Sequence, residues 1–300
     1  MLEVINLQKH FGDFCAIKNL SFTVKSGKIL GLIGQNGSGK TTTFRLILNL
    51  LTKETGKVLW NGHALNQSDY NDIGFLPEER GLDSKDTIEN QLYFFAALRG
   101  KSKKEIDPLI DKYMEKFQIK GKRKDKIKKL SKGNQQKVQL ITTLIHQPQL
   151  IILDEPFSGL DPINAQILID GILEIKAKGA SIIFSSHNMD NVEKLCDQLI
   201  MLRSGEVVLG GSVQEIREGY GRTRLTIEST LTKQELLNIA GVESVKETST
   251  LAYHLTLKNP AIAHDIWKKA MEQVDYLPVF STESPTLEEI FKMKIGEAHE

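Results

Sequence analysis

The chain has 300 residues, 40% of them hydrophobic and 26% charged, a composition typical of a globular protein. Its formal net charge of +1 at pH 7 gives no overall electrostatic reason to expect a nucleic-acid partner. No apolar run approaches the roughly 20 residues of a membrane-spanning helix, and the two cysteines, Cys15 and Cys196, fit no metal or redox spacing. Any role at a membrane therefore requires a partner that spans it.

The first part of the chain is expected to be rich in β-strands. Apolar or alternating segments predict strands at 2–11, 16–24, 28–34 and 56–62. A helix is expected at 43–51, shortly after the third strand. From about Glu89 to Lys129 apolar residues recur at helical spacing, which predicts a helical region.

A second block of strands and helices begins at residue 149. The continuous apolar run at 149–155 is typical of a buried parallel strand. The further elements expected here are helices at 163–179 and 189–196 and strands at 180–187 and 198–211. Strands that alternate with helices predict an α/β fold with a mostly parallel sheet.

The sequence changes in character near Gly219, which suggests a domain boundary. Beyond it the expected order is strand, helix, strand, strand, helix, strand, which predicts a small ferredoxin-like α+β domain. A last helix is expected at 285–294, with Ser284 as its N-cap and Pro285 as its first residue.

The stretch GQNGSGKTTT, residues 34–43, lies between an expected strand and an expected helix. Glycines let main-chain N–H groups approach a ligand closely, and a helix N-terminus attracts anions. Gly34, Gly39, Lys40 and Thr41 satisfy the pattern G-x-x-x-x-G-K-[ST]. The stretch therefore predicts a nucleotide-phosphate site; the alternative is a Gly-rich turn that binds nothing.

Two acidic residues, Asp154 and Glu155, end the apolar strand at 149–155. In an open parallel sheet, ligands bind at the carboxyl ends of the strands. Asp154 fits a partner for Mg²⁺, which prefers oxygen ligands, and Glu155 fits a general base that activates a water. The alternative is a pair of ordinary surface acids.

A Ser-x-Gly turn at Ser131 opens an expected helix whose apolar residues lie on one face. Ser131 is a good N-cap residue, and capping is one interpretation of the turn. The other interpretation is a second helix N-terminus built to bind phosphate.

Together these segments resemble, over roughly residues 1–215, the nucleotide-binding subunit of ATP-binding cassette (ABC) transporters. GQNGSGKTT resembles the family's Walker A motif, LIILDE its Walker B motif and LSKGNQQ its signature motif. SGLD resembles its D-loop, LPEERGL its Q-loop, and SSHNM contains its switch histidine, His187. The implied fold is a P-loop NTPase of the ABC ATPase type, with a mixed-sheet core, a β-rich N-terminal subdomain and a helical insert.

The resemblance implies where ATP and Mg²⁺ bind. The ATP-binding residues would be the aromatic Phe11 and the loop residues Gly34, Gln35, Asn36, Gly37, Ser38, Gly39, Lys40, Thr41 and Thr42. Mg²⁺ would be held by Thr41, Asp154 and Glu78. Catalysis would rest on Glu155, His187 and Lys40, since phosphoryl transfer is catalysed mainly by positioning and charge neutralisation.

The resemblance further implies that two such subunits pair head to tail around ATP. The signature residues Ser131, Lys132, Gly133, Asn134 and Gln135 would face the partner's ATP, and the D-loop would comprise Ser158, Gly159, Leu160 and Asp161. Two features depart from the family pattern. The signature reads L-S-K-G-N where L-S-G-G-Q is usual, and Glu78 stands where glutamine is usual. A glutamate could still bind Mg²⁺ or a water, although its charge alters the site.

Both departures are similar to a branch of bacterial export-type ATPases, and the residues beyond 221 resemble the C-terminal extension of its drug-resistance and sodium-export members. We therefore expect a nucleotide-binding domain at 1–218, with a helical subdomain at about 85–135, and an accessory domain at 221–300.

The function implied is ATP hydrolysis that drives export through a separate transmembrane permease. The protein would pair with a second copy of itself or a homologous ATPase and lie in the cytoplasm, on the inner face of the cell membrane. The alternative is a soluble ABC-type ATPase that acts on ribosomes or nucleic acid. The basic run at 119–129 contains no aromatic residue, which favours a solvated surface or contact with acidic lipid headgroups over a specific nucleic-acid site.

Overall fold

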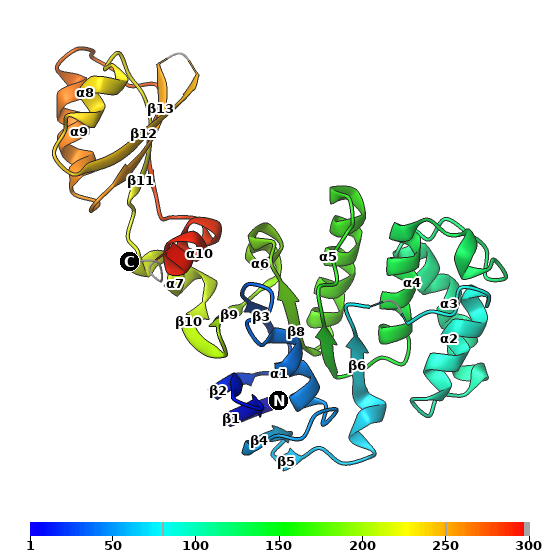
Figure 1. The fold of residues 1–300 in the computed structure, drawn as a ribbon. Helices are drawn as coiled ribbons and strands as arrows, with labels where there is room; N and C mark the ends of the chain where they lie inside the picture. Colours follow the sequence, from blue (N-terminus) through cyan, green and yellow to red (C-terminus); the bar gives the residue numbers. More distant parts are fainter. Residues whose placement is uncertain (80, 250, 297–300) are drawn as a thin grey trace. The chain divides into compact units, whose positions relative to one another are not determined.

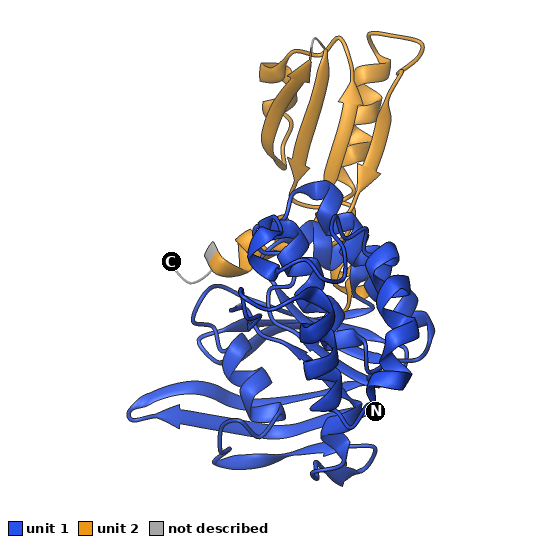
Figure 2. Ribbon diagram, turned by 90° about the vertical axis from the view of Figure 1, so that its right-hand side faces the viewer, with its two compact units in different colours: residues 1–211 blue, residues 212–300 orange. Residues whose placement is uncertain are grey.

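The computed structural model describes residues 1–79, 81–249 and 251–296. The chain divides into two compact units, residues 1–211 and 212–300 (Figure 2). The sequence predicts a boundary at 218–221, at the end of α7 (Val213–Gly219). The structure divides the chain before α7 and groups this helix with the second unit. Each unit has a hydrophobic core of its own.

The start of unit 1 is an antiparallel sheet with the strand order β2-β1-β4-β5. Its strands are β1 (Leu2–Phe11), β2 (Phe14–Val24), β4 (Thr55–Trp60) and β5 (His63–Ala64). Buried and exposed residues alternate along parts of β1 and β2, so each strand turns one face toward the core. This sheet is the predicted β-rich N-terminal part.

The larger sheet of unit 1 has six strands in the order β10-β9-β3-β8-β7-β6 (Figure 1). They are β3 (Ile29–Ile33), β6 (Ile73–Leu76), β7 (Leu150–Leu153), β8 (Ser181–Ser186), β9 (Gln198–Arg203) and β10 (Glu206–Ser212). The pairs β3–β8, β3–β9, β6–β7 and β7–β8 are parallel, which confirms the predicted α/β sheet. Every residue of β3, β7 and β8 is buried, as the apolar runs of β3 and β7 indicate. The short strand β6 was not predicted.

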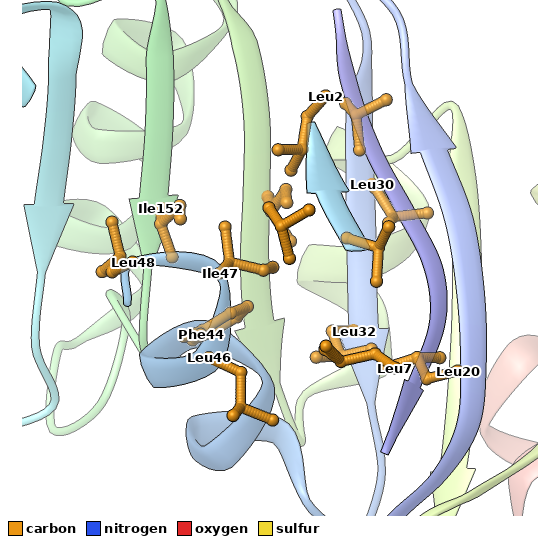
Figure 3. Close-up of a cluster of buried hydrophobic side chains, with 14 of the residues drawn as sticks. Leu2, Leu7, Leu20, Leu30, Leu32, Phe44, Leu46, Ile47, Leu48 and Ile152 are labelled. Carbon is orange, nitrogen blue, oxygen red and sulfur yellow. The ribbon is translucent and has the colours of Figure 1, made fainter. Parts of the chain in front are cut away.

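The core of unit 1 joins both sheets to α1 (Lys40–Ile47). Figure 3 shows Leu7, Leu20 and Leu32 meeting between β1, β2 and β3. Phe44 and Ile47, on the inner face of α1, are fully buried in the same cluster. Burial of such a side chain contributes about 1.5–3 kcal/mol, so the cluster fixes α1 against the sheet through the second half of the helix.

The remaining helices of unit 1 are α2 (Ile88–Ala97), α3 (Lys103–Lys116), α4 (Lys132–Leu144), α5 (Pro162–Ala177) and α6 (Met189–Leu195). The helical region predicted up to Lys129 is wrong at its end, because α3 stops at Lys116 and only the short 3-10 helix Ile127–Lys129 follows. Gln118 has a φ of 49°, which a right-handed helix cannot contain. None of the helices in the described part of the chain is long and apolar enough to cross a membrane.

Unit 2 contains the predicted order of strands and helices, which confirms the ferredoxin-like pattern. Its elements are β11 (Arg224–Glu228), α8 (Lys233–Leu237), β12 (Val242–Ser249), β13 (Ala252–Leu257), α9 (Ile262–Met271) and β14 (Phe280–Glu283). The sheet order is β12-β13-β11-β14, with every pair antiparallel.

The last helix, α10 (Leu287–Gly296), begins later than predicted. The Oγ1 of Thr286 accepts a hydrogen bond from the N–H of Glu289 at 3.2 Å, and the Glu289 carboxylate accepts one from the N–H of Thr286 at 2.9 Å. This reciprocal pair is a capping box. Thr286 is therefore the N-cap, and the prediction of Ser284 is wrong.

Candidate active site

The loop at 34–39 joins β3 to α1 through a backbone that requires glycine. Gly37 and Gly39 have φ values of 80° and 110°. A Cβ atom on Gly39 would lie 2.7 Å from the carbonyl oxygen of Ala16, and one on Gly34 would lie 2.4 Å from that of Leu202. Gly39 is the N-cap of α1 and gives no side-chain cap, so the first N–H groups of α1 are open to an anion.

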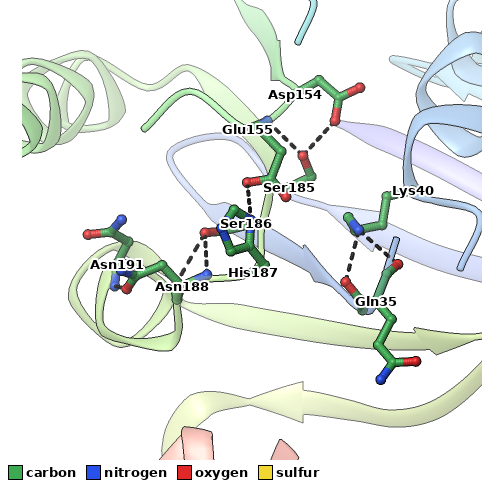
Figure 4. A network of polar contacts seen from close by, with 10 residues as sticks. Gln35, Lys40, Asp154, Glu155, Ser185, Ser186, His187, Asn188 and Asn191 are labelled. Atoms are coloured by element: carbon green, nitrogen blue, oxygen red, sulfur yellow. Dashed lines mark hydrogen bonds and ion pairs between the residues drawn. The ribbon is translucent and has the colours of Figure 1, made fainter. Parts of the chain in front are cut away.

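Lys40, the first residue of α1, folds back over this loop. Its Nζ donates hydrogen bonds to the carbonyl oxygens of Gly34 and Gln35, at 2.8 and 3.1 Å (Figure 4). Burial lowers the pKa of Lys40, while the nearby carboxylates of Glu155 and Asp154 act in the opposite direction. The ammonium group is thus held on the same loop as the main-chain donors.

The neighbouring Thr41 contacts the acid that ends β7. Its Oγ1 donates a hydrogen bond to Oδ2 of Asp154 at 2.8 Å. The other oxygen of Asp154, Oδ1, accepts a hydrogen bond from Oγ of Ser185 at 2.6 Å. The predicted pair of Thr41 and Asp154 is therefore brought together, and a hydroxyl beside a carboxylate is a donor set that suits Mg²⁺.

Ser185, near the end of β8, is a site residue that the sequence analysis missed. Its Oγ accepts a hydrogen bond from the N–H of Glu155 at 2.8 Å while donating to Asp154. One hydroxyl thus fixes both acids of the Walker B-like stretch. The signal was present, because Ser185 lies two residues before His187 at the carboxyl end of a parallel strand.

Glu155 has the features of a strained and functional residue. It adopts a φ of 48°, unusual for a residue other than glycine. Its Oε2 lies 3.0 Å from Nδ1 of His187 (Figure 4). Its Oε1 is buried and has no hydrogen-bond partner among the described residues. A buried carboxylate oxygen without a donor is suited to accept a hydrogen bond from a water.

Lys40, Thr41, Asp154 and Glu155 line one cavity of about 380 Å³, together with Gly37 and Gly39 of the loop. Its wall consists of Phe11, Phe14, Ala16, Asn36, Gly37, Gly39, Lys40, Thr41, Thr42, Glu78, Asp154 and Glu155. Phe11 and Phe14, which face each other across the β1–β2 turn, are 48% and 57% exposed. Phe14 was not predicted, although a second aromatic three residues after Phe11 was a visible signal.

The signature residues lie outside the wall of this cavity. Ser131 caps α4, and its Oγ accepts hydrogen bonds from the N–H and the Nδ2 of Asn134, at 3.3 and 3.1 Å. In the first turn of α4, Lys132 is exposed and Gly133 is half-buried. Gln135 donates through Nε2 to the carbonyl oxygen of Leu130 at 3.0 Å. The chain therefore presents two separate helix N-termini, at α1 and at α4.

The D-loop-like residues border a second cavity, of about 350 Å³. Ser158, Gly159 and Leu160 line it together with Glu155 and His187. Asp161 is the N-cap of α5, where its side chain accepts a hydrogen bond from the N–H of Asn164 at 2.9 Å. Glu155 thus borders both cavities.

Comparison with known proteins decides the family. Residues 17–158 match the family described as ABC transporter, and residues 211–295 match the C-terminal domain of the family described as ATP-binding protein DrrA1-3-like. The uncharacterized ABC transporter ATP-binding protein YhaQ of Bacillus subtilis is 39% identical over 300 residues, which is 100% of this chain and 100% of that protein. The chain belongs to the ABC transporter ATP-binding protein family.

Two further likenesses agree with this ABC family membership. Nod factor export ATP-binding protein I of a Rhizobium species is 32% identical over 222 residues, covering 73% of each protein. A solved structure of an ATP-binding subunit of an ABC transporter has a TM-score of 0.68 and 31% identity, and covers 74% of this chain and 93% of that one. The predicted family, the P-loop ABC ATPase fold and the ATPase activity are confirmed at the level of the family. Subunits of this family bind ATP, dimerise and work with transmembrane permease components.

Proposed function

We propose that this ABC ATPase subunit binds ATP and Mg²⁺ in the 380 Å³ cavity and hydrolyses the ATP within a dimer that drives export through a separate membrane permease. The observation that carries the proposal is the convergence of Lys40, Asp154 and Glu155 on one cavity beside an open helix N-terminus. Cation, carboxylate and main-chain donors are the components that phosphoryl transfer requires.

The phosphates occupy the loop end of the cavity in this proposal. The first N–H groups of α1 and the Nζ of Lys40, which now contacts two loop carbonyls, hold the β- and γ-phosphates. Thr41 and Asp154 hold Mg²⁺, with Glu78 in the same wall. When bound, Mg²⁺ neutralises charge on the phosphate oxygens. The ring of Phe11 stacks on the adenine at the open end.

Glu155 is the general base of this site. Its unpartnered Oε1 accepts the proton of the attacking water. The His187 ring holds Oε2 from the other side at 3.0 Å, and its exposed edge contacts the γ-phosphate. Ser185 fixes the main chain of Glu155. These contacts orient the base before ATP arrives.

The signature helix serves a second subunit rather than its own cavity. Ser131 and Gly133 lie at the N-terminus of α4 and outside the cavity wall. We assign them to the γ-phosphate of ATP bound by a partner, which is a second copy of this chain or a homologous ATPase. ATP binding then joins the subunits and hydrolysis releases them, a ligand-driven population shift.

Export is favoured over the alternative action on ribosomes or nucleic acid. The match to a DrrA1-3-like C-terminal domain and the likeness to a Nod factor export protein support an export role. A chain of this kind acts at the inner face of the cell membrane, where its permease partner spans the bilayer.

The decisive experiment is affinity purification of Glu155→Gln from gently solubilised membranes in the presence of ATP, followed by mass spectrometry. A multi-span membrane protein in stoichiometric amount supports the proposal and identifies the permease. Recovery of ribosomal or nucleic-acid-bound material in its place overturns it. Lys40→Ala, which loses the phosphate contact, is the matched control for ATP-dependent association.

A further inference from the structure

The segment between α3 and α4 carries an unusual concentration of positive charge. Seven lysines with exposed side chains lie in residues 120–132, which we name the lysine loop: Lys120, Lys122, Lys124, Lys126, Lys128, Lys129 and Lys132. The only acid in the same stretch is Asp125. Since the whole chain has a net charge of only +1, the charge of the lysine loop is a local property.

The ammonium groups of these seven lysines form no ion pair with a carboxylate of the described residues. Arg123, the one arginine of the loop, behaves differently. Its guanidinium donates to Asp111 at 2.6 and 2.7 Å and to Asp107 at 2.9 Å. Arg123 thus joins the loop to α3 through Asp107 and Asp111, whereas the ammonium groups of the lysines face solvent.

The lysine loop connects α3 to α4 (Figure 1) and contains the 3-10 helix Ile127–Lys129 and the first residue of α4, Lys132. Its main chain is held in place by hydrogen bonds to the segment before and at the start of α2. The N–H of Ile127 donates to the carbonyl oxygen of Asp86 at 2.9 Å, and the N–H of Glu89 donates to that of Arg123 at 3.0 Å. Exposure alternates along the loop, because Arg123, Asp125 and Ile127 turn inward. Four lysines turn outward: Lys122, Lys124, Lys126 and Lys128. The result is a fixed cationic surface rather than a free tail.

The loop is also joined to the signature serine. Oδ1 of Asn134 accepts a hydrogen bond from the N–H of Lys120 at 3.1 Å, and Nδ2 of the same side chain donates to Oγ of Ser131 at 3.1 Å. The side chain of Asn134 is buried. Whatever binds the lysine loop therefore contacts the segment that leads into the α4 N-terminus.

The chemistry of the surface selects among anionic partners. Sites for single-stranded nucleic acid combine positive charge with aromatic side chains on which bases stack, and residues 118–132 contain no aromatic residue. The arginine that could bind phosphate in a two-pronged manner is engaged by Asp107 and Asp111. Exposed lysines whose ammonium groups are not held by a protein partner suit a membrane surface with many charged headgroups.

We propose that the lysine loop is a binding surface for anionic phospholipid headgroups. The proposal rests on the membrane location given under the proposed function, but it concerns the lipid and not the permease. Vesicles that contain no permease therefore test it separately.

The experiment measures sedimentation of the full chain with vesicles of pure phosphatidylcholine or of an equimolar mixture with phosphatidylglycerol. The test variant replaces four lysines of the loop: Lys122→Gln, Lys124→Gln, Lys126→Gln and Lys128→Gln. The control removes the same charge from exposed lysines of unit 2: Lys233→Gln, Lys246→Gln, Lys258→Gln and Lys268→Gln. A third variant changes the four loop lysines to arginine and keeps their charge.

The parent chain is expected to bind the anionic vesicles and to be released at about 1 M salt, where the Debye length is roughly 3 Å. The loop variant is expected to bind about tenfold more weakly or worse, whereas the unit 2 control and the arginine variant bind like the parent. Equal weakening by the loop variant and the unit 2 control, or the absence of a preference for anionic vesicles, overturns the proposal.

Nucleic acid is the competing partner and is tested with a mixed-sequence single-stranded RNA. Tighter binding of the RNA than of the anionic vesicles, lost in the same loop variant, also overturns the proposal. Unchanged circular dichroism and thermal unfolding of the loop variant show that it is folded. If the loop variant loses vesicle binding but still co-purifies with a permease, both the lipid-binding proposal and the proposed function are supported. Lipid binding by the lysine loop is then independent of permease binding.

Discussion

Glu155 and His187 are linked at 3.0 Å through one carboxylate oxygen, Oε2, and one ring nitrogen, Nδ1. The second oxygen, Oε1, is buried and unpartnered among the described residues. The two oxygens of one side chain therefore have different environments: the first is oriented by the protein and the second is left for a ligand. This asymmetry supports the proposed role of Glu155 in proton transfer, with His187 as the residue that positions it in addition to making the phosphate contact proposed above.

Glu155→Gln is expected to lower the ATPase rate at least about 100-fold, since positioned general bases contribute about 10²–10⁴. The amide keeps the shape of the side chain but cannot accept a proton. ATP binding should persist, so the variant is expected to form an ATP-dependent dimer that size-exclusion chromatography detects. Asp190→Asn, an exposed acid that borders the second cavity, is the matched control and should retain the parent rate. An undiminished rate in Glu155→Gln would remove its role as the base.

Glu78→Gln tests the departure at the Q-loop. Glu78 lines the cavity with Asp154 and Glu155, so its carboxylate adds a third negative charge there. An amide oxygen also ligates Mg²⁺, and we expect the variant to keep at least about a third of the parent ATPase rate. Steady-state rates over a range of Mg²⁺ concentrations measure this, with Glu78→Ala as the comparison that removes the oxygen. A larger loss in Glu78→Gln would show that the carboxylate itself is required.

Phe14 is expected to contribute to nucleotide affinity together with Phe11. Both rings line the cavity and are about half exposed, which leaves their faces available to a base. Stacking of a base on an aromatic ring contributes about 1–3 kcal/mol. Phe14→Ala should therefore raise the KM for ATP at least about fivefold with kcat nearly unchanged. Phe94→Ala, which removes an exposed ring from α2, should change neither constant. An unaltered KM in Phe14→Ala would leave Phe11 as the sole aromatic contact.

The sequence predicts those parts of the fold in which one local pattern decides the outcome. The runs that form β3 and β7 contain no polar side chain, because both faces of a parallel sheet are covered. The end of α3 was missed for two reasons. Gln118 adopts a φ of 49° although it is not a glycine, and the hydrogen bond that holds Ile127 is made to Asp86, which is distant in the sequence. Thr286 took the cap predicted for Ser284, because the capping box requires Glu289 three residues later.

In the candidate site, too, residues set by a local sequence pattern were predicted and residues set by contacts in space were missed. The glycines, Lys40 and Asp154 are recognisable from spacing, since the phosphate loop is continuous in the sequence. Ser185 and Phe14 were missed because their roles arise from neighbours in space. Ser185 contacts the acids only through the pairing of β7 with β8. Phe14 reaches the cavity only because β1 and β2 form a hairpin.

His146 makes the stability of unit 1 sensitive to acid. The side chain is buried, with Nε2 3.2 Å from the carbonyl oxygen of Ile73. Its Nδ1 has no partner among the described residues. Burial lowers the pKa of His146 from its ordinary value of 6.5 to about 4, and the charges of Arg99 and Lys101 act in the same direction. The folded chain therefore disfavours the protonated ring.

The sign of the pH dependence follows from this lowered pKa. Between pH 6.5 and about 4 the unfolded chain binds a proton at His146 that the folded chain does not. The free energy of unfolding therefore falls as the pH falls through this window, by roughly 2.5 kcal/mol by pH 4.5. His146→Gln cannot titrate, so its free energy of unfolding should fall less than that of the parent by about this amount.

Urea unfolding followed by the fluorescence of Trp60, which is buried in unit 1, measures this difference at several pH values. Trp267→Phe removes the other tryptophan, which lies in unit 2 and is 41% exposed, so that the signal reports on unit 1 alone. His63→Gln, an exposed histidine of β5, should keep the acid sensitivity of the parent. Parallel pH profiles for the parent and His146→Gln would show that the folded and unfolded chains bind a proton at His146 equally well, and the acid sensitivity would then arise from other groups.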